Sequence, residues 1–371
     1  MRNLIQALAL VSAFALVAPA CGDKAEEKKE DSKKDDAKKD DKKDRDKKDP
    51  ATTGTAAASG TPTAAASAAP TAAPVLDVPS GRADALGHIP AGCEAVLSVD
   101  IAKIAKHRAV SKDIVPRLET LASAESKDPG VQRFQSFSKE TGFKLQGLGN
   151  LGLCVDTEGG GEPLWTVLIG SDLKSGSFVP ALEKAMDPAK KATLGEIDGV
   201  KTISDGKGTF VQFADGVIGI APTADRLKAS LKPGADLTAY KLDRAKELSF
   251  FLGKALITSD LAKKFGKASD MVKDIEDVTG SIDLPAGKVQ MTLRTASADG
   301  AKTLDALVTL MKAEFSKDKR IPAQFGLLEA VKSIAARIDG NNVILEMTFP
   351  AASIDEAVKL LATQIDAAIK K

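Results

Sequence analysis

The side chains that most readily act as nucleophiles or metal ligands are scarce in this chain of 371 residues. They are three cysteines and two histidines: Cys21, Cys93, Cys154, His88 and His107. A zinc site needs three or four Cys, His or carboxylate ligands, and these residues are not spaced to supply them. His88 lies at the edge of a linker, and His107 stands between a lysine and an arginine on a helical segment that we expect to face solvent.

Motifs of known catalytic chemistry are incomplete. The Ser-x-x-Lys pattern of penicillin-recognising enzymes occurs at Ser136–Lys139 without its companion motifs. Gly159–Gly161 is not followed by Gly-Lys-Ser/Thr, so a hairpin turn is favoured over a phosphate-binding loop. The carboxylates Asp274, Glu276 and Asp277 are typical of a charged helix end. We therefore predict no catalytic, cofactor-binding or metal-ligating residue and no cofactor, with an enzyme site built from distant carboxylates as an alternative.

Cys21 follows a secretory signal pattern. Arg2 supplies a positive start, Leu4–Val17 is an almost continuous apolar run, and small residues precede the cysteine. The apolar run is too short for a stable membrane span. Residues 1–20 are therefore predicted to be a signal peptide, and cleavage after Ala20 by an ordinary signal peptidase would leave Cys21 as an incidental thiol.

The stretch Val17-Ala18-Pro19-Ala20-Cys21 resembles the cleavage motif of bacterial lipoproteins. That resemblance implies a diacylglycerol on the thiol of Cys21 and a membrane partner held through this lipid. It implies a place in the cell envelope and no particular activity. Gly22, in place of an aspartate after the cysteine, favours the outer membrane, facing the periplasm or the cell surface.

A long polar segment follows Cys21. Residues 21–49 contain twelve acidic and twelve basic side chains and almost no apolar ones, so they cannot bury enough surface to fold. Residues 50–85 are rich in Ala, Thr and Pro, which is typical of a linker. As a random coil, residues 22–75 would span roughly 40 Å, and fully extended they would reach on the order of 180 Å. We predict a disordered tether that holds the globular part away from the membrane.

Beyond the tether the charge is balanced. From residue 50 onward acidic and basic residues occur in equal numbers, so the chain lacks the basic footprint of a nucleic-acid-binding protein. We therefore expect an envelope protein, a glycan or a lipid as the partner rather than a nucleic acid.

The globular part is predicted to be α+β and to consist of two similar halves, 86–235 and 236–371. Each half has the order strand, helices, hairpin, helix, hairpin, helix, which predicts an antiparallel sheet with helices packed on one face. Strands are expected near 95–101, 151–157, 164–171, 199–204, 208–213, 216–221, 248–257, 277–284 and 288–295. A hairpin is expected over 336–349, with Asp339–Asn342 as its turn. Helices are expected near 102–124, 130–140, 177–186, 224–231, 298–316, 322–335 and 353–369.

The stretch Ile89–Ile101, followed by a helix, resembles the start of duplicated, uncharacterised envelope lipoproteins of Gram-negative bacteria. This resemblance implies no known activity. In the last predicted helix the residues Ile354, Val358, Leu361, Ile365 and Ile369 recur every three or four positions. This stripe predicts core packing, and a lipid-binding stripe is the alternative.

If Cys21 carries a lipid, Cys93 and Cys154 remain as an even pair in an oxidising compartment. They could form a disulfide, or they could be two buried thiols, because cysteine is often a small core residue.

The sequence thus favours a lipid-anchored, non-enzymatic binding or scaffold module. A carrier of an apolar ligand in a cupped sheet is an alternative.

Overall fold

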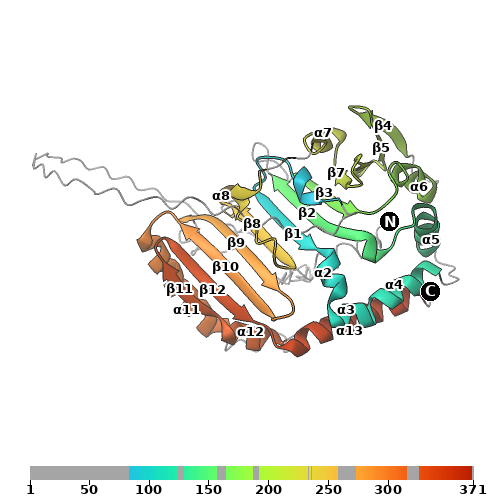
Figure 1. Cartoon of the computed structure of the whole chain (residues 1–371). Coiled ribbons are helices and arrows are strands. Elements are labelled where there is room, and N and C mark those ends of the chain that lie inside the picture. Colours follow the sequence, from blue (N-terminus) through green and yellow to red (C-terminus); the bar gives the residue numbers. More distant parts are fainter. Residues whose placement is uncertain are drawn as a thin grey trace, which may run out of the picture. The chain divides into compact units, whose positions relative to one another are not determined.

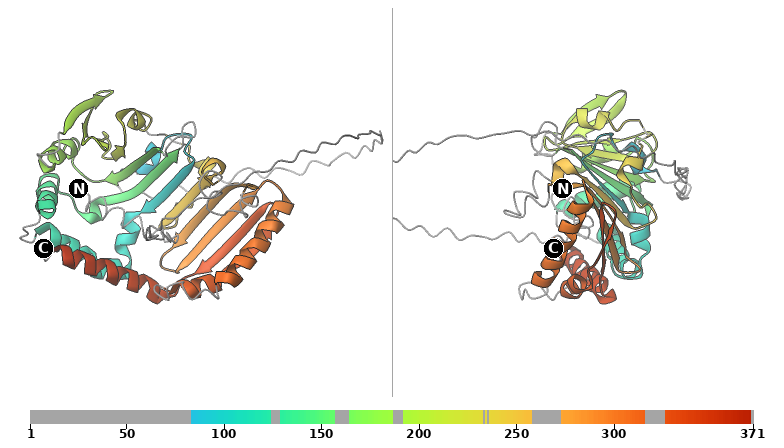
Figure 2. Two further views of the ribbon diagram at one scale, coloured as in Figure 1. Left: turned by 180° about the vertical axis from the view of Figure 1, so that it is seen from behind. Right: turned by 90° about the vertical axis from the view of Figure 1, so that its left-hand side faces the viewer.

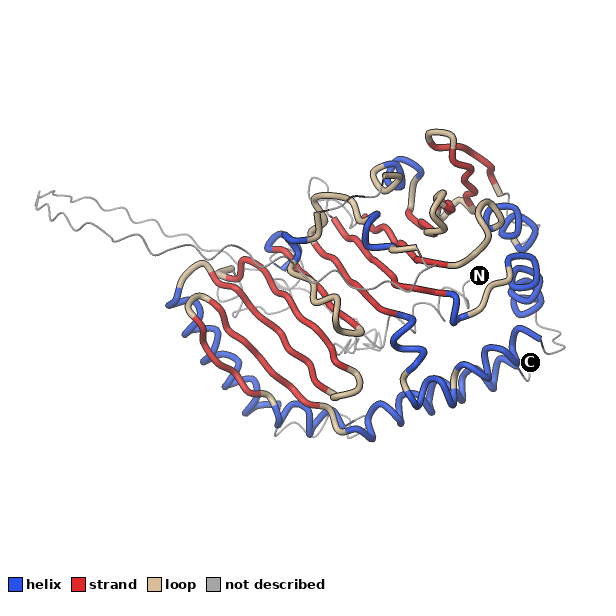
Figure 3. The backbone as a smooth tube through the Cα atoms, viewed as in Figure 1, coloured by secondary structure: helices blue, strands red, loops and turns tan. Residues whose placement is uncertain are grey.

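One antiparallel sheet runs through the part of the chain that the computed structural model describes (Figures 1 and 3). The structure describes residues 83–123, 129–156, 164–186, 192–232, 234, 236–257, 273–315 and 326–369, which all belong to one compact unit. The sheet has twelve strands in the order β11-β12-β10-β9-β8-β1-β2-β3-β7-β6-β5-β4. They are β1 (Ala95–Asp100), β2 (Leu148–Asp156), β3 (Leu164–Ser171), β4 (Thr193–Ile197), β5 (Val200–Ser204), β6 (Thr209–Gln212), β7 (Ile218–Ala221), β8 (Leu248–Gly253), β9 (Ile275–Asp283), β10 (Lys288–Thr295), β11 (Ala335–Asp339) and β12 (Asn342–Thr348).

The two halves of the sheet have the same strand order. From the centre outward, the first half runs β1-β2-β3-β7-β6 and the second runs β8-β9-β10-β12-β11. The halves meet where β1 pairs antiparallel with β8, with Ser98 opposite Ser249. The predicted α+β class with antiparallel hairpins is confirmed, and the two expected sheets are continuous with each other. The first half carries one additional hairpin, β4–β5, at its outer edge.

The helices alternate with the hairpins along the chain. They are η1 (Ala85–His88), α2 (Ile101–Lys106), α3 (Arg108–Asp113), α4 (Val115–Ser123), α5 (Pro129–Thr141), η2 (Leu145–Gly147), α6 (Phe178–Ala185), α7 (Ala224–Lys228), η4 (Thr238–Tyr240), α8 (Lys254–Leu256), α11 (Ala298–Phe315), α12 (Leu327–Ser333) and α13 (Ala351–Ile369). Strand β1 passes directly into α2, because the carboxylate of Asp100 caps the helix by accepting the Lys103 N–H at 2.8 Å.

Several expectations from the sequence differ from the structure. The strand expected over 248–257 ends at Gly253, and Lys254–Leu256 form the short helix α8. The single helix expected over 102–124 is three short helices, because His107 has an extended backbone (ψ 133°) between α2 and α3. Glu276 and Asp277 lie in strand β9 rather than at a helix end. Strand β4 lies at an edge of the sheet, in a segment where no strand was expected.

The last helix packs on helices of the other half. α13 contacts α3 and α4, and Figures 1 and 2 show it running alongside them. Its buried residues Val358 and Ala362 form a cluster with Ala109 and Ile114 of the first half. The prediction that the apolar stripe of this helix packs in a core is confirmed, and that core lies between helices.

Each half of the sheet has one face packed under helices. Residues Val99, Leu151 and Ile169 of the first half share a buried cluster with side chains of α6. In the second half, Ala301 and Leu304 of α11 pack against the strands, and the buried sheet residues there include Ile275, Val278, Val343 and Leu345.

The opposite face differs between the halves. In the first half it is also buried, under Leu86 and Ile89 of the leading segment and under Tyr240. In the second half it is mostly polar, and several of its side chains are half-buried or exposed: Thr279, Ser281, Gln290, Thr292, Arg337 and Glu346. Ser249, Asp277 and Ile344 on the same face are buried.

Candidate functional site

An apolar cavity of about 110 Å³ lies where α13 packs against the first-half helices and the centre of the sheet. The sheet contributes Val99 from β1, Leu248 from β8 and Ile282 from β9. The remaining lining residues are Ile101, Ile104, Ala105, His107, Val110, Ile114, Leu118, Leu284, Ile354, Val358 and Leu361. The cavity therefore has walls from both halves of the chain and from both the sheet and the helices.

Ordinary helix periodicity places these side chains. Ile101, Ile104 and Ala105 are three or four residues apart on α2, so they share one face of that helix. Ile354, Val358 and Leu361 follow the same spacing on α13. The apolar stripe that was predicted from the sequence is thus one wall of the cavity as well as part of a core.

Among the described residues that line the cavity, His107 is the single titratable one. Its Nδ1 atom is buried and has no hydrogen-bond partner among the described residues. The expectation that His107 lies on a solvent-facing helix surface was therefore wrong. The helix ends at this residue, and the ring becomes part of the cavity wall. The sequence did contain a signal for this position of His107, because the apolar residues Ile104 and Val110 lie three positions before and after it.

The size and lining of the cavity limit what it can hold. A dry, apolar cavity of roughly 150 Å³ in another protein binds benzene, so about 110 Å³ corresponds to one small ring or a short alkyl chain. Burial of such a group is favourable by about 0.8 kcal/mol for each CH₂ removed from water. The arrangement is therefore suited to binding an apolar group and carries no carboxylate that could act as an acid or base.

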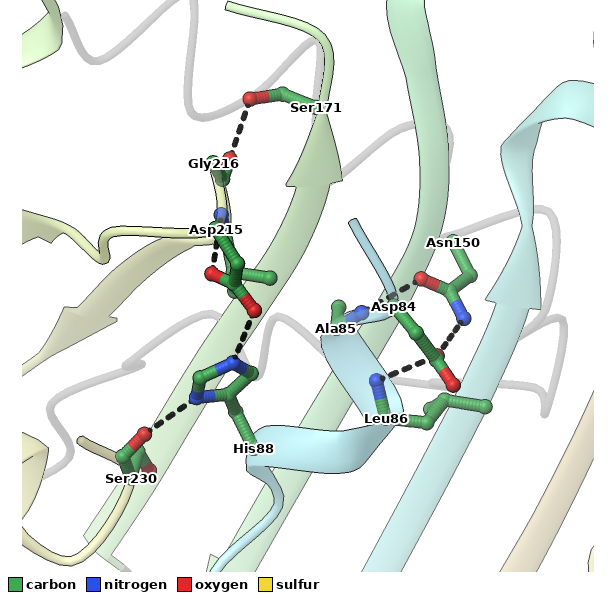
Figure 4. Close-up of polar contacts among 10 residues, drawn as sticks. Asp84, Ala85, Leu86, His88, Asn150, Ser171, Asp215, Gly216 and Ser230 are labelled. Carbon is green, nitrogen blue, oxygen red and sulfur yellow. Dashed lines mark hydrogen bonds and ion pairs between the residues drawn. The ribbon is translucent and has the colours of Figure 1, made fainter. Parts of the chain in front are cut away.

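The second histidine lies in a polar cluster on the other face of the first half (Figure 4). His88 is buried, with Nε2 2.7 Å from Oδ2 of Asp215 and Nδ1 2.7 Å from the carbonyl oxygen of Ser230. Its ring also stacks on Phe213 at a centroid distance of 4.7 Å. The spacing of residues in the sequence did not indicate these contacts, because the partners of His88 come from loops 127 and 142 residues away. With both ring nitrogens engaged, His88 is a structural contact rather than a base.

Asp84 and Asn150 fix the start of the folded part beside this cluster (Figure 4). The Asn150 amide donates to Oδ1 of Asp84 at 2.6 Å, and its oxygen accepts the Ala85 N–H at 2.9 Å. Arg244 adds an ion pair to Oδ2 of Asp84 at 2.6 Å. A Cβ atom at Gly170 would lie 2.0 Å from the carbonyl oxygen of Ala83, so only glycine lets the segment approach the sheet this closely.

A disulfide holds the same segment. Cys93 and Cys154 are bonded, with Cα atoms 5.5 Å apart, and the bond joins the end of the leading segment to β2. Arg226 of α7 approaches Cys154 Sγ at 3.4 Å and forms an ion pair with Asp156. The leading segment is therefore fixed at three points: by the contacts of His88, by the hydrogen bonds between Asp84 and Asn150, and by the disulfide of Cys93.

The other residues that the sequence singled out do not form a site with these. Cys21, the tether and Gly159–Gly161 lie outside the described residues. Ser136 and Lys139 of α5 are both exposed and line an open hollow of about 500 Å³. Within the described ranges there is no group of three or more His, Cys, Asp or Glu side chains that could hold a metal ion. No described helix is both long and apolar enough to cross a membrane.

Comparison with known proteins gives little further information. No family model matches the chain, and no curated protein matches it. Solved structures that resemble it include crystal form I of TP0453, with a TM-score of 0.40 and 11% sequence identity, covering 75% of this chain and 97% of that chain. Crystal form IV of TP0453 has a TM-score of 0.40 and 8% identity, covering 76% of this chain and 96% of that chain. Likeness at this level carries no conclusion about this chain.

Proposed function

We propose that this chain is a lipid-anchored protein of the cell envelope whose globular part binds an apolar ligand without catalysing a reaction on it. The observation that carries the proposal is the cavity, whose described lining residues are apolar except for one histidine. The signal pattern that ends at Cys21 and the charge-mixed stretch after it support the anchor and the tether. The ligand would lie in the cavity between the sheet centre, α2, α3 and α13.

Ligand binding can be tested with benzene, which has the size of the cavity and is soluble in water. Binding to the native state raises the midpoint of thermal unfolding by mass action. Two variants fill the cavity from different walls: Val358→Phe from α13 and Ala105→Leu from α2. We expect benzene to stabilise the unaltered protein and to have no effect on either variant.

A matched control is Leu310→Phe, which enlarges an exposed leucine on α11 outside the cavity lining. It should respond to benzene as the unaltered protein does. If benzene does not raise the midpoint in the unaltered protein, or raises it equally in both filled variants, the apolar-ligand proposal is wrong.

The anchor has an independent test in cells. Cys21→Ser removes the only thiol at the expected attachment point and should move the protein from the membrane fraction to the soluble fraction. Intact-mass analysis of the mature N-terminus should also show a diacylglycerol on Cys21. A variant that stays membrane-bound would contradict lipid anchoring, and the cavity test would be unaffected by that result.

A second candidate function is binding of an envelope protein or glycan by the polar sheet face of the second half. Ser281, Gln290 and Glu346 are register partners across β9, β10 and β12 on this face. A row of hydroxyl, amide and carboxylate groups is suited to a polyhydroxylated ligand. Co-sedimentation with purified cell-wall glycan would test it, with Gln290→Ala expected to weaken binding and Leu310→Phe to leave it unchanged.

A further inference from the structure

We infer that the ligand of the apolar cavity is an amphiphile, with a small apolar body and a hydroxyl or carboxyl group that hydrogen-bonds to Nδ1 of His107. This inference rests on the proposed function, because it names the class of ligand that the same cavity takes. It adds a specific polar contact to a site that is otherwise defined by its apolar lining.

The first argument is the unpartnered nitrogen itself. Buried side-chain polar atoms nearly always have a hydrogen-bond partner, so each exception needs an explanation. Nδ1 of His107 is buried and has none among the described residues. The other described members of the cavity lining are Val, Ile, Leu and Ala, so none of these side chains can supply one.

The second argument is that the backbone of His107 is already satisfied. Its N–H donates to the carbonyl oxygen of Ile104 at 3.0 Å, and its own carbonyl accepts the Ser111 N–H at 2.8 Å. The neighbours Lys106 and Arg108 are exposed and are not part of the cavity lining. Nδ1 is thus a buried polar atom of this turn that is left for a bound molecule.

The chemistry of the ring then selects the head group. A neutral imidazole carries its proton on either nitrogen, so Nδ1 is a donor in one tautomer and an acceptor in the other. A hydroxyl or a protonated carboxyl group can donate and accept, and therefore pairs with both tautomers. A head group at Nδ1 leaves the rest of the 110 Å³ for a single ring or a short alkyl chain.

The number of histidines gives a direct readout. The chain contains two, so the imidazole ¹⁵N spectrum of the full chain with ¹⁵N-labelled histidine has one set of signals for His107 and one for His88. His88 is an internal control, because both of its ring nitrogens are engaged elsewhere in the molecule. Benzene and phenol are the matched probes, since they differ by one hydroxyl group.

We expect phenol to bind about three- to tenfold more tightly than benzene, which is the effect of one additional hydrogen bond. Phenol should shift the Nδ1 signal of His107 and leave the His88 signals in place. In His107→Phe, which keeps a ring and removes its nitrogens, the two probes should bind equally. His107→Gln keeps a polar group and should retain part of the preference for phenol.

Each result separates the two proposals. If benzene and phenol bind equally to the unaltered protein and His107 does not shift, the hydrogen-bonded head group is wrong and the apolar-ligand function stands. If neither probe binds, the function fails and the inference fails with it. Since the spectrum is recorded on the unaltered protein, the decision does not depend on whether a variant folds.

Discussion

The two halves of the sheet share one strand order and differ in what covers their second face. In the first half Leu86, Ile89 and Tyr240 cover it, and the disulfide and the contacts of His88 hold that covering. In the second half the corresponding face is polar and partly exposed. The same arrangement of strands is thus buried on both faces in one half and on one face in the other.

The difference comes from side chains at equivalent places in the two strand orders. On this face β2 carries Gly152 and Cys154, and a Cβ atom at Gly152 would lie 3.2 Å from atoms of Leu86 and Ile89. The equivalent strand β9 carries Thr279 and Ser281 instead. Small and apolar residues admit a covering segment, whereas hydroxyl groups favour water. This shows that the strand order alone does not decide which face of such a sheet can serve as a surface.

The largest effect is expected from removing the disulfide. The double variant Cys93→Ala/Cys154→Ala opens a loop with a sequence separation of 61. In the chain-entropy model such a loop contributes about 4 kcal/mol to the free energy of unfolding. Urea unfolding should show a loss of that size, and the reduced unaltered protein is the control that separates the cross-link from lost side-chain packing. A loss below about 1 kcal/mol would mean that packing alone holds the covering segment.

The next effect is expected from His88→Ala. This change removes two hydrogen bonds and the ring stacking on Phe213. Together these contribute about 2–4 kcal/mol, and the loss should appear in urea unfolding. Native-state hydrogen exchange should show faster opening of the leading segment than of the second half.

The matched control for His88 is His88→Phe, which should retain the stacking and lose both hydrogen bonds. Asp215→Ala should cost less than His88→Ala, because the Asp215 side chain is 44% exposed and water can replace part of its contact. Equal costs for all three variants would contradict the view that His88 holds the segment through its two nitrogens.

Much of the fold could be predicted from local sequence. The pair β11–β12 followed from alternating residues around the turn at Asp339-Gly340, and α13 followed from its apolar stripe. Strand β4 could not be predicted, because four of its five residues are exposed and an edge strand without a buried face has no alternation. The stripe of α13 indicated an apolar partner but could not indicate that this partner is in the other half.

The candidate site was less predictable than the fold. The contacts of His88 join residues that are distant in the chain, so no spacing could indicate them. For His107, the sequence contained two conflicting signals about whether the side chain faces solvent or an apolar surface. Its charged neighbours Lys106 and Arg108 pointed to solvent, and the apolar residues at i−3 and i+3 pointed to the cavity, which is where the structure places it.

The next prediction concerns an ion pair on the polar sheet face of the second half. Arg294 and Asp277 are register partners, and Arg294 Nε donates to Oδ2 of Asp277 at 2.7 Å. This hydrogen bond raises the pKa of Arg294. Because the Asp277 side chain is only 9% exposed, Arg294→Ala leaves a buried carboxylate without its cross-strand partner and should cost about 1–3 kcal/mol in urea unfolding.

The double variant Arg294→Gln/Asp277→Asn is the control for Arg294→Ala. It removes both charges and leaves no unpaired carboxylate, so it should be more stable than the single variant. If Arg294→Ala leaves the free energy of unfolding unchanged, the ion pair does not stabilise the polar sheet face of the second half.

The smallest effect is expected within the second half, where Lys246 precedes β8 and Asp283 ends the neighbouring strand β9. Their ion pair is 2.7 Å long and partly exposed, so Asp283→Asn should cost less than about 1 kcal/mol at pH 7. The hydrogen bond from Lys246 lowers the pKa of Asp283, and the same bond raises the pKa of Lys246.

The signs of these shifts define a pH window for that pair. Stability from Asp283 is fully present above the unfolded carboxyl pKa of about 3.9, and it is lost as the pH falls through the lowered folded value. Stability from Lys246 is present below the unfolded pKa of about 10.4 and is lost as the pH rises through the raised folded value. The difference between the unaltered protein and Asp283→Asn should therefore be constant from about pH 5 to 9 and should vanish in acid. The hydrogen bond from Lys302 also lowers the pKa of Asp299, so Asp299→Asn should show a profile of the same sign, and a smaller one because both side chains are well exposed. A difference for Asp283→Asn that persists at pH 2 would show that Asp283 acts mainly through its hydrogen bond from the Ala286 N–H rather than through the ion pair with Lys246.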